Sequence, residues 1–204
     1  MPPSENSDAG SAGSFASFIA EVTVPHIKLP EGAPGIRGPM LAYRNSEPHL
    51  NALAEAVIRG PSSLTVAERE MIATYVSSGN ECYFCTNTHA AAARHLLGEK
   101  RALMDDILAD VASAHVDDKL RALLVIAGKV RKDGRLVTEE DVQLARDAGA
   151  DDQAIHDTVL IAAMFCMYNR YVDGLATWAP RDPAVYEEIG ARLATQGYGS
   201  SFRK

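Results

Sequence analysis

The strongest constraint on the fold is the spacing of the apolar residues, which is helical along most of the chain. Between Leu50 and Ile58, for example, apolar residues recur at intervals of three and four. No segment shows the sustained alternation of apolar and polar residues that marks a strand. Helices of this kind bury their apolar faces by packing on one another. The sequence therefore predicts an all-α fold, a helical bundle of about seven or eight helices.

The expected helices can be placed from their start and stop signals. Thr65 and Glu68 form a capping-box pattern, and Asn80 is a candidate cap for the next helix. The segment from Val159 to Met167 is apolar on every side, which predicts a position at the centre of the bundle. The expected helices cover about 46–60, 65–76, 81–97, 101–109, 117–132, 138–149 and 152–173, and a last one opens at Asp182.

The two ends of the chain lack helical periodicity. Residues 1–14 are small and polar, and we expect a disordered N-terminal tail. Residues 15–45 include four prolines and three glycines between Pro25 and Pro39, which predicts an extended arm in place of a helix. The all-helical domain is expected over 46–197, followed by a short C-terminal tail at 198–204.

Composition excludes several classes of function. The formal net charge of −7 argues against a nucleic-acid partner, and no Lys/Arg block is present to dock on an anionic membrane. The first residues lack the basic and apolar regions of a signal peptide, and no apolar run is long enough to span a bilayer. We therefore expect a cytoplasmic protein. Three cysteines in that reducing compartment suggest redox chemistry or metal binding, not a disulfide scaffold.

Cys82, Cys85 and His89 are spaced so that they share one face of the helix expected at 81–97. Helical residues three apart have Cα atoms roughly 5 Å from each other, within the range of a disulfide. The start of the helix favours a thiolate, most strongly at Cys82, although Glu81 opposes this effect. His89 follows Cys85 by one turn, so its imidazole can act as a base or a stabilising cation.

Glu70 belongs to the preceding helix, which the turn at 77–80 folds back antiparallel to the helix of the cysteines. A carboxylate at that level can orient His89 and relay a proton. Cys166 is interpreted as a small buried hydrophobe. The other histidines have no evident partner in sequence and are expected to be structural or solvated: His26, His49, His95, His115 and His156.

The spacing Glu70–x11–Cys82–x–x–Cys85–x3–His89 resembles the alkyl hydroperoxidase D core of the carboxymuconolactone decarboxylase-like superfamily. The segments 64–89 and 167–173 resemble its peroxidase-related branch. The resemblance implies that Cys85 is the peroxidatic thiol, that Cys82 resolves its sulfenic acid, and that Glu70 and His89 relay protons. It implies no cofactor and no metal. One residue departs from the pattern, because Phe84 stands where the best-studied members carry a histidine.

The same resemblance implies the partners of the reaction. The substrate would be an organic hydroperoxide or hydrogen peroxide, and an external dithiol, from a lipoyl or thioredoxin-like protein, would restore the thiols. Antioxidant defence is the implied role. A homo-oligomer (dimer, trimer or hexamer) is also implied.

Other functions remain open at this point. The cysteine pair can act as a dithiol/disulfide oxidoreductase without peroxidase turnover. Glu70, Cys82, Cys85 and His89 can also be considered as four zinc ligands, although structural zinc sites usually take ligand pairs from separate elements. A cofactor-free decarboxylase does not explain the cysteine pair. A thioredoxin-like fold is excluded because no βαβ pattern surrounds the cysteines.

Overall fold

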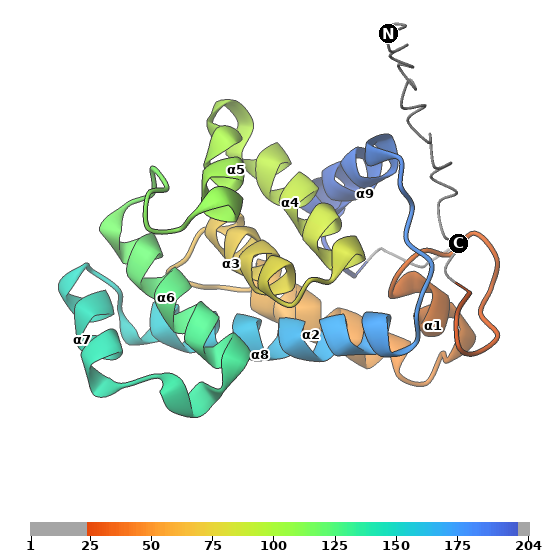
Figure 1. The fold of residues 1–204 in the computed structure, drawn as a ribbon, viewed down its shortest axis with the longest axis horizontal. Helices are drawn as coiled ribbons and strands as arrows, with labels where there is room; N and C mark the ends of the chain where they lie inside the picture. The colour runs from red at the N-terminus through yellow and green to blue at the C-terminus, as the bar shows by residue number, and fades with distance from the viewer. Residues whose placement is uncertain (1–23, 200–204) are drawn as a thin grey trace, which may run out of the picture.

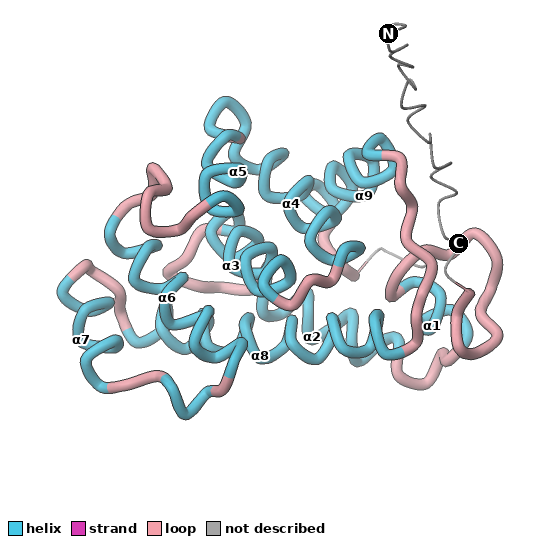
Figure 2. Tube along the Cα trace, viewed as in Figure 1, coloured by secondary structure: helices cyan, strands magenta, loops and turns pink. Residues whose placement is uncertain are grey.

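The computed structural model describes residues 24–199, which form nine α-helices, two short 3₁₀ turns and no strand (Figures 1 and 2). The predicted all-α fold is confirmed, with one helix more than expected. The helices are α1 (Arg37–Ala42), α2 (Glu47–Arg59), α3 (Val66–Gly79), α4 (Tyr83–Leu97), α5 (Ala102–Ala109), α6 (Asp118–Lys132), α7 (Glu139–Asp147), α8 (Asp152–Gly174) and α9 (Pro183–Gln196).

The hairpin of α3 and α4 occupies the middle of the molecule (Figure 1). The predicted capping box begins α3: Thr65 Oγ1 accepts from the backbone N–H of Glu68, whose carboxylate accepts from the backbone N–H of Thr65. The prediction that Asn80 caps α4 is wrong. Asn80 instead ends α3 and donates to Asn169 Oδ1 of α8 at 2.9 Å. Cys82 is the N-cap of α4, with an extended backbone.

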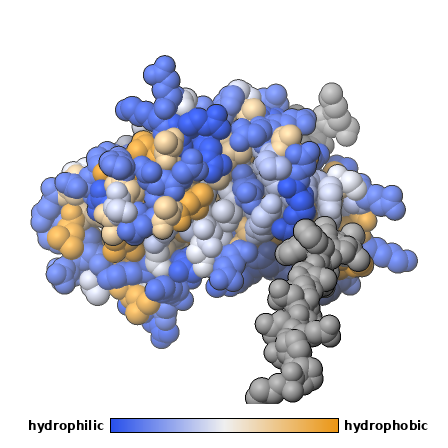
Figure 3. Space-filling view, turned by 45° about the horizontal axis from the view of Figure 1, so that its top comes forward, coloured by the Kyte–Doolittle hydropathy of each residue, from blue (hydrophilic) through white to orange (hydrophobic). Residues whose placement is uncertain are grey.

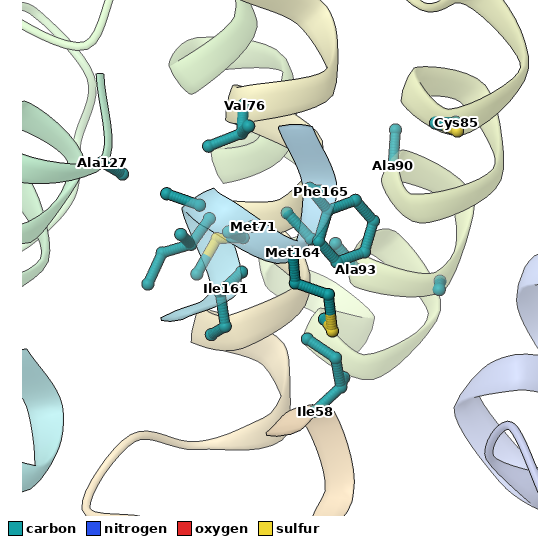
Figure 4. Packing of buried hydrophobic residues seen from close by; sticks show 14 of the residues in the cluster. Ile58, Met71, Val76, Cys85, Ala90, Ala93, Ala127, Ile161, Met164 and Phe165 are labelled. Carbon is teal, nitrogen blue, oxygen red and sulfur yellow. The ribbon is translucent and has the colours of Figure 1, made fainter. Parts of the chain in front are cut away.

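Helix α8 packs against α3 and α6 and supplies much of the core (Figure 4). Phe165 is almost completely buried and faces α4. The centroid of its ring lies 4.6 Å from that of the His89 ring, and the two rings meet edge to face. The predicted central position of residues 159–167 holds for one face of α8 only, because Val159, Ala163 and Met167 are exposed. These three residues are four apart, so they form one stripe along the helix.

Helix α9 lies close against α4 because the facing residues are small. A Cβ atom added to Gly190 would lie 2.7 Å from the backbone of Ala91 and 2.6 Å from its side chain. Ala91 and Ala92, which are both buried, lie at this contact. The close approach positions the end of α9, and the residues that follow it, beside the His89 end of the site.

The segment before α2 is packed on the domain and is not a free arm. The backbone N–H of Gly35 donates to Trp178 O at 2.8 Å, and that of His26 donates to Leu175 O at 3.0 Å. Gly35 has a φ of 54°, and a Cβ there would overlap the ring of Phe84. Helix α1 begins two residues later, so the extended arm expected at 15–45 is wrong for this part.

The surface is mixed in character. On the face drawn in Figure 3, hydrophobic residues form small patches among hydrophilic ones. No helix in residues 24–199 is long and apolar enough to cross a membrane. The tail expected at 1–14 lies outside the described residues.

Candidate active site

The site is built around the carboxylate of Glu70, which is completely buried in α3. Its Oε2 lies 2.8 Å from Nδ1 of His89 on α4, as the hairpin geometry predicts. Its Oε1 accepts from Arg59 of α2 at 2.7 Å and from the hydroxyl of Tyr198 at 3.0 Å. Four separate segments of the chain therefore converge on one carboxylate.

The charge of Glu70 is stabilised by these neighbours. Burial favours the neutral acid, but the hydrogen bond and charge of His89, together with Arg59, outweigh it and hold the pKa of Glu70 below its ordinary value. Burial and the charge of Glu70 raise the pKa of Tyr198 well above its ordinary value, so its hydroxyl remains a donor. A hydrogen bond from Nδ1–H to the carboxylate leaves Nε2 of neutral His89 free to accept a proton.

Cys82 is the N-cap of α4, just outside the helix proper, and Cys85 lies in its first turn. Both are free thiols, and both are buried. A hydrogen bond to the Cys85 sulfur, followed by burial, raises the pKa of Cys82 far above its ordinary value. Burial raises the pKa of Asp173 of α8, and the neighbouring Cys82 thiol acts in the opposite direction.

A largely apolar pocket of about 70 Å³ reaches Cys85 and His89. One water needs about 10–15 Å³ of such space, so the pocket can hold a small molecule. Cys82 does not line it. Thr88, one turn after Cys85, also lines the pocket; its hydroxyl is buried and has no hydrogen-bond partner among the described residues.

Phe84 is packed where the resemblance would place a polar residue. Its ring lies against Gly35 and pairs with the ring of Tyr186 at 6.0 Å. A histidine in that apolar contact would bury a polar side chain, which is costly without a partner. Phe84 thus joins the segment before α1 to the start of α4.

Sequence reasoning missed four neighbours of the expected residues: Arg59, Thr88, Asp173 and Tyr198. The predicted tail at 198–204 places Tyr198 outside the helical domain, although this residue is buried and its hydroxyl oxygen lies 3.2 Å from Nδ1 of His89. Its aromatic character at the chain end was the only available signal. The five other histidines are all exposed. Cys166 is partly buried, not fully buried as predicted, and its sulfur accepts from the amide of Asn80 at 3.5 Å.

The expected ligands do not form a metal centre. Within residues 24–199, no group of three or more His, Cys, Asp or Glu side chains is arranged to hold an ion. Both oxygens of Glu70 are already bound by donors from Arg59, His89 and Tyr198. The zinc alternative therefore has no geometric basis here.

The fold and part of the sequence are similar to those of known proteins. Residues 48–129 match the carboxymuconolactone decarboxylase family. Together with the structural relatives below, this match supports the resemblance to the superfamily of carboxymuconolactone decarboxylase and alkylhydroperoxidase AhpD proteins. No curated protein matches the chain.

Three solved structures are similar. An alkylhydroperoxidase AhpD core, peroxidase-related protein from Ralstonia eutropha JMP134 is 25% identical, with a TM-score of 0.69 over 78% of this chain and 81% of its own. A peroxidase-related protein from Silicibacter sp. TM1040 is 29% identical, with a TM-score of 0.66 over 74% and 78%. A protein of unknown function from Agrobacterium tumefaciens, described as an AhpD candidate for antioxidant defence, shares the fold at 20% identity, with a TM-score of 0.63 over 71% and 97%.

The buried Glu70 charge predicts a specific acid sensitivity. Its folded-state pKa lies below the ordinary value of 4.5, so its contribution to stability is present above that pH and is lost as the pH falls through the folded-state pKa. One such group adds a slope of at most about 1.4 kcal/mol per pH unit. Urea unfolding between neutral pH and pH of about 3.5 should show this slope in the wild type and lose it in Glu70→Gln.

Glu70→Gln should also lower the free energy of unfolding at neutral pH by about 3 kcal/mol, because Arg59 is left without its carboxylate. Glu140→Gln, at an exposed position, is the control and should retain the wild-type slope. Equal acid slopes in the wild type and Glu70→Gln would contradict the assignment.

Proposed function

We propose that this protein is a thiol peroxidase of the alkyl hydroperoxide reductase type, in which Cys85 attacks the peroxide and Cys82 resolves the product. The observation that carries the proposal is the pocket: Cys85 and His89 line it, whereas Cys82 does not, and the Cys85 sulfur raises the pKa of Cys82. The small pocket and the deep burial of both thiols favour a small molecule over a protein disulfide as the oxidant.

In the first step, Nε2 of His89 takes the proton of Cys85, and the thiolate attacks the terminal peroxide oxygen. The O–O bond breaks, and the leaving alkoxide takes the proton back from His89, so that an alcohol and a Cys85 sulfenic acid form. Glu70 holds the imidazole through Nδ1 and stabilises its cation. The Cys85 sulfur and burial raise the pKa of Cys82, so Cys82 keeps its proton during this step.

In the second step, the Cys82 sulfur attacks the sulfenic acid, a disulfide forms, and water leaves. We assign to Asp173 the role of taking the Cys82 proton and passing it to the leaving hydroxide, which departs as water; the raised pKa of Asp173 makes it a better base than an exposed carboxylate. An external dithiol then reduces the disulfide by exchange and is itself oxidised. A lipoyl arm suits the narrow pocket better than a thioredoxin-like surface, since both sulfurs are buried.

Two further proposals complete this function. A homo-oligomer is supported by the exposed apolar stripe of α8 at Val159, Ala163 and Met167. A cytoplasmic location and a role in antioxidant defence fit an enzyme that works through free thiols.

The roles of the two cysteines are separable by substitution. Cys85→Ser should abolish the reaction with peroxide, because the resolving thiol lies outside the pocket. Cys82→Ser should still reduce one equivalent of hydroperoxide and then stop with a sulfenic acid on Cys85. Dimedone labelling followed by peptide mass spectrometry identifies the labelled residue. Label on Cys82 in Cys85→Ser, with none on Cys85 in Cys82→Ser, would reverse the assignment.

Thr88 provides a second test, because its unpartnered hydroxyl can donate to a bound peroxide. Thr88→Val keeps the shape and should lower kcat/KM for hydroperoxide by about tenfold, the value of one hydrogen bond in a buried site. The free energy of unfolding should be unchanged or higher, since a buried polar atom without a partner is removed. Thr74→Val is the contrasting control: the Thr74 hydroxyl already bonds the Glu70 carbonyl, outside the pocket. Unchanged kinetics in Thr88→Val would remove this residue from the mechanism.

A further inference from the structure

Two arginines stand beside the pocket in an otherwise acidic protein. Arg37 of α1 and Arg192 of α9 both line the pocket that reaches Cys85. Both also line a second, outer hollow of about 160 Å³. They therefore form part of the wall between the cysteine pocket and the surface. Among the described residues that line the inner pocket, His89 is the only other basic side chain, and none is Asp or Glu.

The two guanidinium groups are close enough to affect one another. Burial, and then the charge of Arg37, lower the pKa of Arg192, while Glu188 one turn earlier on α9 acts in the opposite direction. Arg192 makes no ion pair within 4.0 Å with any carboxylate in residues 24–199. Burial and the charge of Arg37 both disfavour the charged form of half-buried Arg192, and an anion bound beside Arg192 would offset this effect.

The chemistry of the pocket narrows the choice of anion. Its remaining walls are mostly apolar side chains, among them Ile36, Met40 and Ile189. A guanidinium pair binds a planar carboxylate well, and an apolar pocket binds an alkyl body. A ligand with both parts would place its carboxylate at the arginines and its other end toward Cys85 and Thr88.

We propose that Arg37 and Arg192 bind the carboxylate of the substrate, so that the preferred substrate is an organic hydroperoxide carrying a carboxylate on an aliphatic body. This inference rests on the proposed peroxidase function and specifies its substrate. The carboxylate keeps its charge throughout and takes no part in the electron transfer. It orients the hydroperoxide group toward the Cys85 sulfur, where the reaction proceeds as described above.

The kinetic test compares acids with their neutral esters. Single-turnover oxidation of the reduced protein, with no reductant present, is followed with γ-hydroperoxyisocaproic acid, linoleic acid hydroperoxide, their methyl esters and tert-butyl hydroperoxide. At least one acid should react about tenfold faster than its ester, the range of one charge-assisted contact. Arg192→Gln and Arg37→Gln should lower that acid rate by about tenfold and leave the ester and tert-butyl hydroperoxide within about twofold.

Two controls separate the charge from the fold. Arg192→Lys should retain part of the acid preference, because it keeps a positive charge. Arg101→Gln, which removes an exposed arginine from outside the pocket, should retain all of it. Equal rates for acids and esters in the wild type, or loss of tert-butyl hydroperoxide reactivity together with the acid preference, would overturn the proposal.

A reductant that carries a carboxylate offers the same group to the two arginines, so it is the alternative ligand of this site. The disulfide form is therefore reduced with dihydrolipoate and with neutral dihydrolipoamide. An effect of the arginine substitutions on dihydrolipoate alone, with none on the acid hydroperoxides, would assign the site to the reductant and overturn the proposal.

A binding measurement separates failure of this inference from failure of the peroxidase function. Trp178 is the only tryptophan of the chain and lines the outer hollow beside both arginines. Isocaproate and linoleate should change its fluorescence at saturable concentrations, and their methyl esters should bind at least about tenfold more weakly. Absence of reaction with every peroxide, with carboxylate binding intact, would refute the peroxidase alone; equal binding of acids and esters would refute the arginine site.

Discussion

The structure depends on the satisfaction of one buried negative charge. Glu70 has no exposure to solvent, and an unpaired carboxylate there would be prohibitively costly. Arg59, His89 and Tyr198 reach it from α2, α4 and the segment after α9, so the same contacts join four parts of the fold and fix the imidazole. The contacts that position His89 as a base are therefore the same contacts that hold these parts of the core together. Replacement of Glu70 is expected to change both.

A second constraint is the contact between the N-terminal segment and the start of α4. Gly35 can approach the Phe84 ring because it has no Cβ, and its positive φ turns the chain into α1. Helix α1 then brings Ile36, Arg37 and Met40 to the pocket wall. Phe84, a departure from the resembling pattern, thus has a structural role. Phe84 gives the pocket an apolar wall next to Cys85, where the resembling pattern has a polar residue. Such a wall fits a substrate with an aliphatic body.

The sequence predicts the local parts of this arrangement well. The α3–α4 hairpin, its capping box and the Glu70–His89 contact follow from helical spacing and a short turn. Arg59 and Tyr198 were missed because they are brought to Glu70 by packing across 11 and 128 residues, which no periodicity encodes. Helix α1 was missed because prolines and glycines signal loops, yet Pro39 lies in its first turn, where the missing N–H costs little. The exposed stripe of α8 was missed because an apolar sequence does not reveal which face meets a neighbour.

The most direct measurement of the central claim is the location of the bond that one equivalent of hydroperoxide creates. Peptide mapping by mass spectrometry under non-reducing conditions, after acid quenching, identifies each thiol of the wild-type protein. The account predicts a disulfide between Cys82 and Cys85 and a free thiol at Cys166, which is partly buried and hydrogen-bonded near Asn80. A disulfide that includes Cys166, or an unmodified Cys82 and Cys85 after the peroxide has been consumed, would contradict it.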